Sequence, residues 1–128
     1  MKGIKMKSHQ NILNSIGNKL GIPLSFDDNK QCMLLLDDDL LVSIQANEHY
    51  WLLNGLISKI KQENCSLWCD LMILNRVLAE KNLGTIGYEP TSEALLYLDS
   101  ITNLSEDNII NKIESFVNKL DDLKKKLT

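Results

Sequence analysis

The sequence has few residues that break secondary structure and no long apolar run. Its 128 residues include only two prolines and six glycines, and apolar residues make up 44% of the chain. This balance is typical of a folded soluble protein rather than a disordered one. No segment approaches the roughly 20 apolar residues of a membrane span, and the N-terminus lacks the apolar run of a secretory signal. We therefore expect one domain, residues 1–128, that stays in the cytoplasm.

Excess positive charge and phosphate-binding motifs are also missing. The formal net charge is -3, whereas a nucleic-acid-binding domain normally shows a basic face that recruits phosphates. The chain has no G-x-x-x-x-G-K-[ST] loop and no G-x-G-x-x-G turn, so nucleotide binding would lack its usual cradle of backbone amides. These absences argue against DNA, RNA and nucleotides as ligands.

The cysteines and histidines are not spaced as in a conventional structural zinc site. Cys32, Cys65 and Cys69 cannot all pair within one chain, and their apolar surroundings are typical of small buried thiols in a reducing compartment. Cys65 and Cys69 are four residues apart and share one side of a helix, but no histidine is near them in sequence. A small thiol or metal enzyme that uses these cysteines with His9 or His49 is a rival hypothesis. Otherwise we expect no catalytic residue, metal or cofactor.

Aspartates occur in two clusters that do not fit a calcium loop. In a loop starting at Asp27 the sixth position is Cys32, and in one starting at Asp37 it is Val42, where the calcium loop needs glycine. We interpret both clusters as solvated turns between strands, because aspartate favours turns and its charge discourages pairing of strand ends. The clusters are Asp27 with Asp28 and Asp37–Asp39.

Periodicity predicts an α+β layout with helices against an antiparallel sheet. Apolar residues recur at helical spacing after Ser8, which we expect to cap the first helix, and Ser105 is the predicted cap of the last helix, whose lysine-rich tail is expected to fray. Between them lie strand-length apolar segments with short polar breaks. The predicted order is helix 9–20, strands 31–36, 40–47 and 49–57, helix 66–80, strands 82–89 and 94–100, and a helix after 105.

The helix 66–80 carries more apolar residues than one face needs. Leu67, Leu71, Leu74 and Leu78 form one stripe, and further apolar residues lie on other sides. Leaving four or five large apolar side chains in water would forgo on the order of 10 kcal/mol, comparable with the stability of a whole domain. A homodimer across this helix would cover the excess on both chains at once. A helix sandwiched inside a monomer is the alternative.

The strand 31–36 has apolar residues on both faces. Met33, Leu34, Leu35 and Leu36 do not alternate with polar residues, so both faces are covered or can be covered. If this strand is at the edge of the sheet, its backbone also offers unpaired N–H and C=O groups to a peptide. Ordinary core beneath the first helix is the other explanation.

A resemblance to a known family runs from about His9 to Leu120. It rests on the ordered segments ILNSIGNKLGIPLSFDDNKQCMLLLD, WLLNGLI, LNRVLAEKNLGTIGYEPTSEALLYLDSI and IESFVNKL. In this combination the chain resembles the class I type III secretion chaperones, and is most similar to the SicP type. Two features depart from that family: the first five residues, MKGIK, look like an extension before a second possible start at Met6, and Leu120 and Leu123 stand where many relatives carry an aromatic residue.

The resemblance implies an acidic cytosolic homodimer without catalytic activity, with the same order of helices and strands. Such chaperones bind the N-terminal segment of an effector in extended form, keep it competent for secretion and help direct it to the export ATPase. For the SicP type the effector has tyrosine phosphatase and GTPase-activating parts. The resemblance assigns the effector-binding groove to Ile12, Ile16, Leu20, Leu24, Phe26, Cys32, Leu34 and Leu36. It assigns the dimer interface to Leu67, Leu71, Leu74, Leu78, Ile86 and Tyr88.

Two consequences can be tested by size-exclusion chromatography with light scattering and by co-purification with an effector fragment. Aspartate at Ile16 or Leu34 should abolish effector binding while the dimer persists, and aspartate at Leu74 should break the dimer. A dimeric regulatory or scaffold domain that binds a folded partner is the main alternative function.

Overall fold

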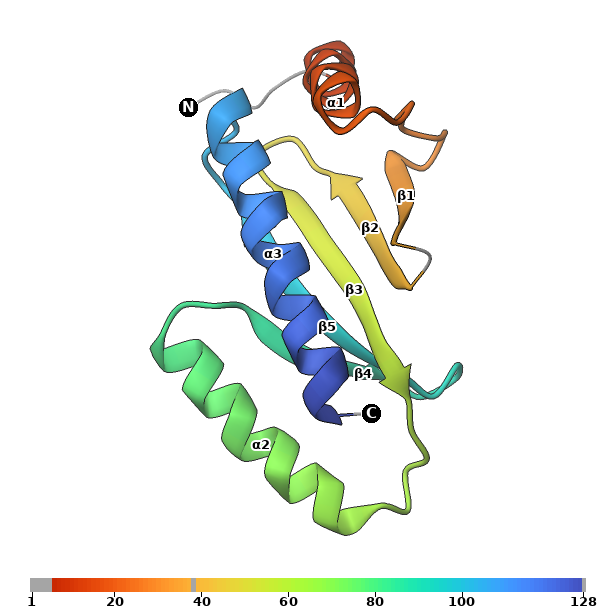
Figure 1. Ribbon diagram of the computed structural model, residues 1–128, viewed down its shortest axis with the longest axis vertical. Coiled ribbons are helices and arrows are strands. Elements are labelled where there is room, and N and C mark those ends of the chain that lie inside the picture. The colour runs from red at the N-terminus through yellow and green to blue at the C-terminus, as the bar shows by residue number, and fades with distance from the viewer. Residues whose placement is uncertain (1–5, 38, 128) are drawn as a thin grey trace.

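The computed structural model describes residues 6–37 and 39–127, which form three helices and five strands (Figure 1). Their order along the chain is the predicted one, and the segment MKGIK lies outside the described residues. The elements are α1 (Met6–Leu20), β1 (Gln31–Leu36), β2 (Leu40–Ala46), β3 (Trp51–Lys59), α2 (Cys65–Glu80), β4 (Thr85–Glu89), β5 (Ala94–Ile101) and α3 (Glu106–Leu127). The α+β prediction is confirmed.

The strands form one antiparallel sheet in the order β1-β2-β3-β5-β4. Strands β1, β2 and β3 form an antiparallel meander, and β4 and β5 form a second hairpin. The hairpin joins the meander through β5, which pairs with β3 and sets Tyr97 opposite Gly55. Strands β1 and β4 are therefore the two edges of the sheet.

Several element boundaries differ from the predicted ones, by two or three residues for α1, β3 and β4. Strand β4 begins at Thr85 rather than 82, because Asn82 and Gly84 take the left-handed backbone conformation of a turn. Helix α1 begins at Met6, so Ser8 lies within the helix rather than capping it; methionine and lysine are good helix formers and extend the first turn. Strand β3 begins at Trp51 rather than 49. The N–H of Asn47 donates to the C=O of Tyr50 at 2.9 Å, and this bond closes a turn over the residues that the sequence pattern assigned to the strand.

The other helix ends follow ordinary capping chemistry. The side chain of Asn64, one residue before α2, accepts a hydrogen bond from the N–H of Leu67 at 3.2 Å. Ser105 caps α3 as predicted, since its Oγ accepts from the N–H of Asn108 at 3.4 Å. The lysine-rich end of α3 does not fray as expected: the helix continues to Leu127, because Leu123 is fully buried beneath it.

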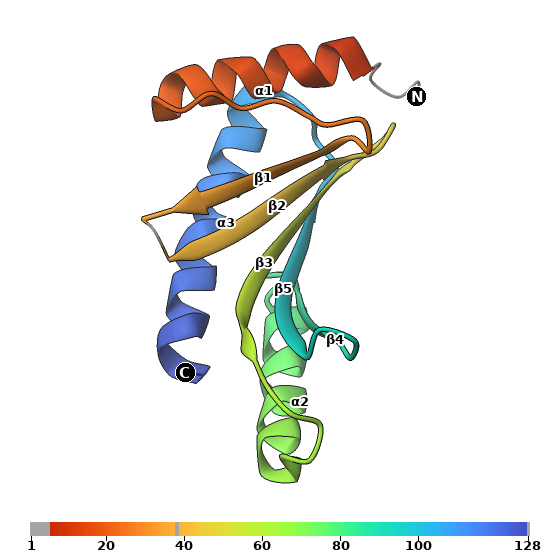
Figure 2. The ribbon, with the colours of Figure 1, turned by 90° about the vertical axis from the view of Figure 1, so that its right-hand side faces the viewer.

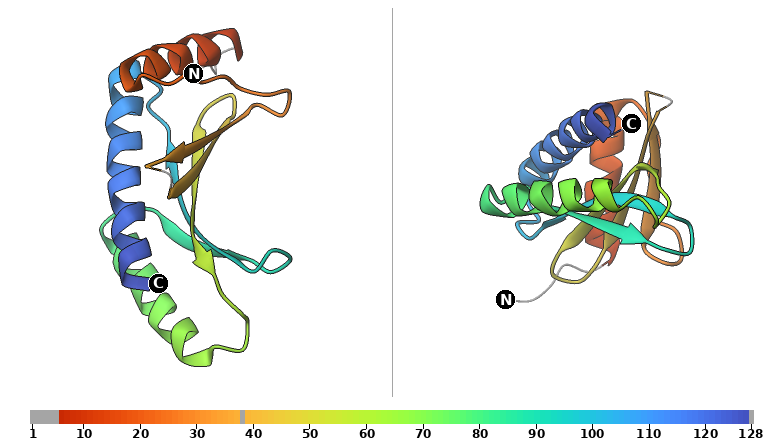
Figure 3. Two further views of the ribbon diagram at one scale, coloured as in Figure 1. Left: turned by 45° about the vertical axis from the view of Figure 1, so that its right-hand side comes forward. Right: turned by 90° about the horizontal axis from the view of Figure 1, so that it is seen from below.

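All three helices lie on one side of the sheet (Figure 3, left). Helix α3 crosses β2, β3 and β5, and its side chains Ile109, Phe116 and Leu120 are buried there. Phe116 stacks on Tyr97 with ring centroids 4.8 Å apart. Helix α1 lies across one end of the sheet and α2 lies at the other end, against β4 (Figure 2). Within residues 6–37 and 39–127, no helix lies on the opposite side of the sheet.

Helix α3 buries one apolar stripe against the sheet, which includes Ile109, Ile113 and Phe116. Leu120 and Leu123, which replace the aromatic residues of many relatives, are both fully buried. No helix of the described part of the chain is long and apolar enough to cross a membrane.

Candidate functional site

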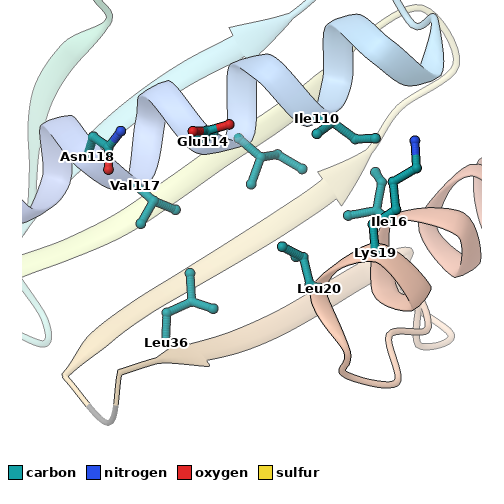
Figure 4. Close-up of a pocket in the computed structure, with 9 residues that line it drawn as sticks. Ile16, Lys19, Leu20, Leu36, Ile110, Glu114, Val117 and Asn118 are labelled. Carbon is teal, nitrogen blue, oxygen red and sulfur yellow. The ribbon is translucent and has the colours of Figure 1, made fainter.

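An apolar pocket lies where α1, the end of β1 and α3 meet (Figure 4). It encloses about 210 Å³. The side chains of Leu20, Leu36 and Val117 point toward the space between the three elements, and Leu20 is 50% exposed. The complete lining of this α1–α3 pocket is Ile16, Lys19, Leu20, Leu36, Ile110, Ile113, Glu114, Val117 and Asn118. A hollow of this kind can take apolar side chains from a partner, since their burial is favourable.

The C-terminal half of α1 is tied to the first turn of α3. Ser15 Oγ donates a hydrogen bond to Glu106 Oε1, and Lys19 Nζ lies 3.5 Å from the same oxygen. The pKa of Glu106 is lowered, mainly by the hydrogen bond from Ser15 and further by the charge of Lys19. These contacts fix the distance between α1 and α3 on one side of the pocket.

The N-terminal half of α1 is tied to the sheet. His9 is buried, and Trp51 Nε1 donates to His9 Nδ1 at 2.6 Å. Since an indole N–H can only donate, His9 Nδ1 must carry the accepting lone pair. Gln10 Oε1 accepts from the N–H of Phe26 at 2.9 Å, and the ring of Phe26 meets that of Trp51 edge to face. Helix α1 is thus anchored at both ends, and the pocket is preformed.

The residues predicted for the effector groove divide into three groups in the structure. Ile16, Leu20 and Leu36 line the α1–α3 pocket. Ile12 and Phe26 are half-buried against the core. Leu24, Cys32 and Leu34 are buried inside the chain, and burial raises the pKa of the Cys32 thiol. The last three therefore offer no side-chain surface to a partner.

The α3 wall of the pocket is not among the residues that the resemblance assigns to the groove. This wall includes Ile110, Glu114 and Val117, which recur at spacings of four and three residues. That spacing places them on one flank of the helix, beside the buried stripe. The sequence does indicate this wall, because Ile110 is apolar but lies outside the buried stripe of α3.

The outer edge of β1 exposes backbone hydrogen-bonding groups. The N–H of Ala46 donates to the C=O of Lys30 at 2.9 Å, which sets the register with β2. In that register Cys32 and Leu34 direct their backbone groups toward β2, whereas Met33 and Leu35 direct theirs outward. The edge strand anticipated from the sequence is confirmed, and it can pair with another chain.

The side chains of Met33 and Leu35 point to the helix-free side of the sheet. They are 60% and 61% exposed. A shallow hollow of about 170 Å³ on that side is lined by Met33 together with Leu41, Ser43, Asn54, Leu56 and Leu96. The sequence indicated apolar residues on both faces of β1, but not the continuation of the second face over Leu41, Leu56 and Leu96. Strand alternation places this open sheet face on the side opposite the buried set. It is a second apolar surface, separate from the α1–α3 pocket.

Helix α2 has an apolar outward face. Met72 is 72% exposed and Ile73 is 57% exposed, and Cys65 and Cys69 are exposed on the same face. The spacing of these four residues matches successive turns of one helix. The excess apolar surface that the sequence indicated on this helix is therefore present, on residues other than those named for the interface.

The residues predicted for the dimer interface lie mainly on the inner side of α2. Leu71 and Leu78 are 4% and 1% exposed, so the single chain already covers them. Tyr88 donates to the C=O of Ile60 at 2.9 Å and packs its ring against Trp68. Leu67, Leu74 and Ile86 are half-buried against the core. The dimer itself stays a prediction, and in this structure the surface available for it is the outward face.

The residues of the rival enzyme hypothesis are far apart. Cys65 and Cys69 lie on α2 at one end of the molecule, whereas the buried His9 lies on α1 at the other (Figure 1). His49 is exposed in the turn before β3, with Nε2 4.0 Å from Glu48. All three thiols are free, as expected, but Cys65 and Cys69 are exposed rather than buried. Within residues 6–37 and 39–127, no three histidine, cysteine or acidic side chains are placed to hold a metal ion.

The first aspartate cluster forms a turn, as predicted. Asp27 Oδ1 accepts hydrogen bonds from the N–H groups of Asn29, at 2.8 Å, and Gln31, at 3.0 Å. The N–H of Asp27 also donates to the C=O of Gln31 at 2.8 Å. The carboxylate thus stabilises the entry into β1.

Comparison of the sequence with models of known protein families shows the family of this chain. The model of the Tir chaperone protein (CesT) family matches residues 11–124, and the chain therefore belongs to that family. The predicted resemblance to type III secretion chaperones is confirmed. The closer similarity to the SicP type stays a prediction.

Solved structures with the same fold come from complexes. A chain of the ExsC–ExsE complex is similar with a TM-score of 0.83 and 14% identity, over 94% of this chain and 93% of that one. A chain of the HopA1–SchA chaperone–effector complex is similar with a TM-score of 0.78 and 17% identity, over 95% of this chain and 98% of that one. The Yersinia pestis type III secretion chaperone SycH, in complex with a fragment of YscM2, is similar with a TM-score of 0.64 and 14% identity. The match covers 90% of this chain and 98% of that one.

Proposed function

We propose that this protein is a type III secretion chaperone that binds an extended N-terminal segment of an effector and keeps it competent for secretion. The observation that carries this proposal is the preformed α1–α3 pocket, which lies at the end of the exposed β1 edge. A partner in extended form can pair with the backbone of the edge and set side chains into the pocket. Family membership and the structural likeness to chains from complexes support the same function.

Two apolar surfaces adjoin the β1 edge and are available to the client. A strand that pairs with Met33 and Leu35 would place alternate side chains on the open sheet face and on the helix side, where Leu36 lines the α1–α3 pocket. An extended segment loses chain entropy on binding and gains main-chain hydrogen bonds and apolar burial over a long path. Binding on both sides of one edge strand supplies that burial without a folded partner.

The Leu20→Asp substitution tests the pocket. Leu20 is half-exposed, so a charge there should spare the fold but oppose burial of an apolar client side chain. Since burying one large apolar side chain is worth about 1.5 to 3 kcal/mol, we expect roughly a tenfold or larger loss of affinity. The client would be identified by mass spectrometry of proteins that co-purify from the native cell, and its N-terminal fragment would then be titrated.

The matched control is Asn18→Asp, which adds the same charge to an exposed position of α1 outside the pocket. It should leave client affinity within about twofold of wild type, as surface substitutions usually do. Equal affinity of wild type and Leu20→Asp would refute the pocket as the binding site. Aspartate at Ile16 or Leu34, expected from the sequence to abolish client binding alone, would instead disrupt folding, because both side chains are almost completely buried.

We also propose that the protein is a homodimer through the outward face of α2. Met72 and Ile73 expose large apolar side chains there, and a two-fold axis would cover the same residues on both chains. The half-buried Leu67, Leu74 and Ile86 could extend this interface at its rim. Leu71 and Leu78 would support it only from inside each chain.

The remaining features of the proposal follow from the family. We expect one domain over residues 1–128, a cytoplasmic location, no catalytic activity and transfer of the client to the export ATPase. An effector with tyrosine phosphatase and GTPase-activating parts is the client suggested by the similarity to the SicP type. A dimeric scaffold that binds a folded partner is the second candidate. The preformed pocket beside an unpaired strand edge favours an extended client over a folded one.

A further inference from the structure

A second pocket lies on the other flank of α3 from the α1–α3 pocket. This α3–β5 pocket encloses about 260 Å³ between α3, β5 and the loop after α2, where Asn82 and Leu83 form one wall. The stacked rings of Tyr97 and Phe116, both buried, lie at its base. It shares no lining residue with the α1–α3 pocket. Helix α3 thus separates two pockets of different chemistry.

The α3 wall of this pocket is polar and carries two lysines. Asn108, Asn111, Lys112, Ser115 and Lys119 line it, at spacings of three, four and seven residues that place them on one side of the helix. Lys112 and Lys119 are half-buried. In the part of the chain that the structure describes, neither takes part in an ion pair, whereas three other lysines do. Two lysines without an ion pair, on a chain of net charge -3, form a locally basic site.

The single carboxylate in the pocket does not neutralise both lysines. Asp99 Oδ1 accepts a hydrogen bond from the N–H of Ser100 at 2.9 Å, and the pocket lining holds no other acidic residue. Its net charge is therefore positive by one unit, two lysines against one aspartate. An anionic group is the complementary ligand.

The size and the amide groups point to part of a protein chain rather than a free cofactor. Sites for drug-sized ligands usually enclose about 300 to 1,000 Å³, and this pocket is smaller. Asn82 and Asn111 can each donate and accept hydrogen bonds, as a peptide backbone requires, whereas Asn108 Nδ2 already donates to the C=O of Asn103 at 2.7 Å. The aromatic base suits the aliphatic stem of a glutamate or aspartate side chain.

We infer that the α3–β5 pocket binds an acidic protein segment, with a carboxylate placed against Lys112 and Lys119. The site is spatially separate from the α1–α3 pocket, because the two pockets have no lining residue in common. Charge would then determine which segments bind at this site, whereas apolar contacts determine binding on the other flank of α3.

The test uses the full chain labelled with ¹⁵N and a blocked octapeptide of alternating glutamate and glycine. The expected result is a set of amide shift changes confined to residues around the pocket, such as Ser115 and Asp99, weakened by added salt. The same peptide with glutamine in place of glutamate should bind at least roughly fivefold more weakly, since each lost charge pair accounts for a modest factor. Sodium acetate is titrated alone, and shifts at the same residues of equal strength would mean an adventitious ion only and would overturn the inference.

The residue test is the double variant Lys112→Gln and Lys119→Gln. It should weaken binding of the acidic peptide roughly fivefold or more without changing the rest of the spectrum. The control is Lys125→Gln, another α3 lysine, whose Nζ lies 2.9 Å from Asp121 outside the pocket. A second variant, Ser115→Glu, places a negative charge in the pocket and should block the peptide. Equal binding by the glutamine peptide, or equal loss in the Lys125→Gln control, would overturn the inference.

Discussion

At the scale of single residues, Gly55 shows how closely α3 approaches the sheet. A Cβ atom at Gly55 would lie 2.6 Å from Leu120 Cδ2 and 2.9 Å from Leu120 Cδ1. Leu120 is itself fully buried, so it has little room to move away. Glycine is required at this point of β3 because the helix lies directly over the strand.

We predict that Gly55→Ala destabilises the protein by about 1 to 3 kcal/mol, the usual cost of overpacking a core. The measurement is the urea midpoint of unfolding. The control is Gly87→Ala on the edge strand β4, where the nearest atom, Leu98 Cδ1, is 3.0 Å away and belongs to the end of a side chain that is not fully buried. A loss in the control as large as that in Gly55→Ala would contradict this account of the helix contact.

The hydrogen bond from Ser15 to Glu106 predicts a pH dependence of stability. The folded-state pKa of Glu106 is lowered from its ordinary value of 4.5, so this carboxylate stabilises the fold above that value and loses the effect as the pH falls through the lowered pKa. We predict that Ser15→Ala is less stable than wild type at pH 7, and that the difference shrinks at pH 3. Urea unfolding at the two pH values measures it.

The exposed neighbour Asn18 supplies the control for this experiment. Asn18→Ala removes a polar side chain of α1 that has no part in the Glu106 contact. Its stability difference from wild type should not depend on pH. A Ser15→Ala difference that is the same at pH 3 and pH 7 would show that the hydroxyl acts independently of the charge on Glu106.

Single residues also mark the limit of what the sequence can predict. The apolar character of Leu34 and of Leu35 is the same, yet one is 3% exposed and the other 61%. Alternation along β1 says that neighbours face opposite ways, but only the packed helices decide which side is covered. The groove prediction therefore selected residues of the right strand and included some from its buried side.

At the scale of elements, α2 has an apolar outer side that no other element of the described chain covers. Its inner side is buried against β4 and the core, while Met72 and Ile73 remain in water on the outer side. The sequence predicted the excess apolar surface correctly, because the number of apolar residues on a helix does not depend on its orientation. It could not say which stripe turns inward, since both stripes are apolar.

We predict that Ile73→Asp converts the protein from a dimer to a monomer. A charge in the centre of an apolar interface loses the burial of isoleucine and adds a desolvation cost on both subunits. Size-exclusion chromatography with light scattering gives the mass. Ile73 is 57% exposed in the single chain, so the variant should fold normally.

Leu35→Asp is the matched control, since Leu35 is exposed to a similar extent on the open sheet face. It should remain dimeric and should lose client binding instead. A monomeric wild type would contradict the proposed dimer. If Leu35→Asp were the monomeric variant, the dimer would lie on the sheet rather than on α2.

At the scale of the whole molecule, one sheet separates a helix-covered side from an open side (Figure 3). The order of elements was predictable, because strand-length and helix-length apolar segments alternate clearly with turn residues. The order of strands in the sheet, with β5 between β3 and β4, depends on long-range pairing that local patterns do not encode. This arrangement leaves β1 at the edge and exposes it to a partner.

We predict that the client segment becomes protected over tens of residues when it is bound, a length typical of segments that wrap large surfaces. Limited proteolysis and amide hydrogen exchange of the N-terminal fragment, alone and with the chaperone, measure this. Protection on the chaperone should appear at Met33 and Leu35 of β1 and around Leu20. Protection of a compact folded client without changes at β1 would favour the scaffold alternative.

The turn at Asp27 sets the starting point for any strand that joins the β1 edge. Asp27 occupies both the N–H and the C=O of Gln31, so an incoming chain finds its first open partner at Met33. The register of the paired client strand then determines which of its side chains face the helices and which face the helix-free side of the sheet. A client shifted by one residue would turn every anchor to the wrong side.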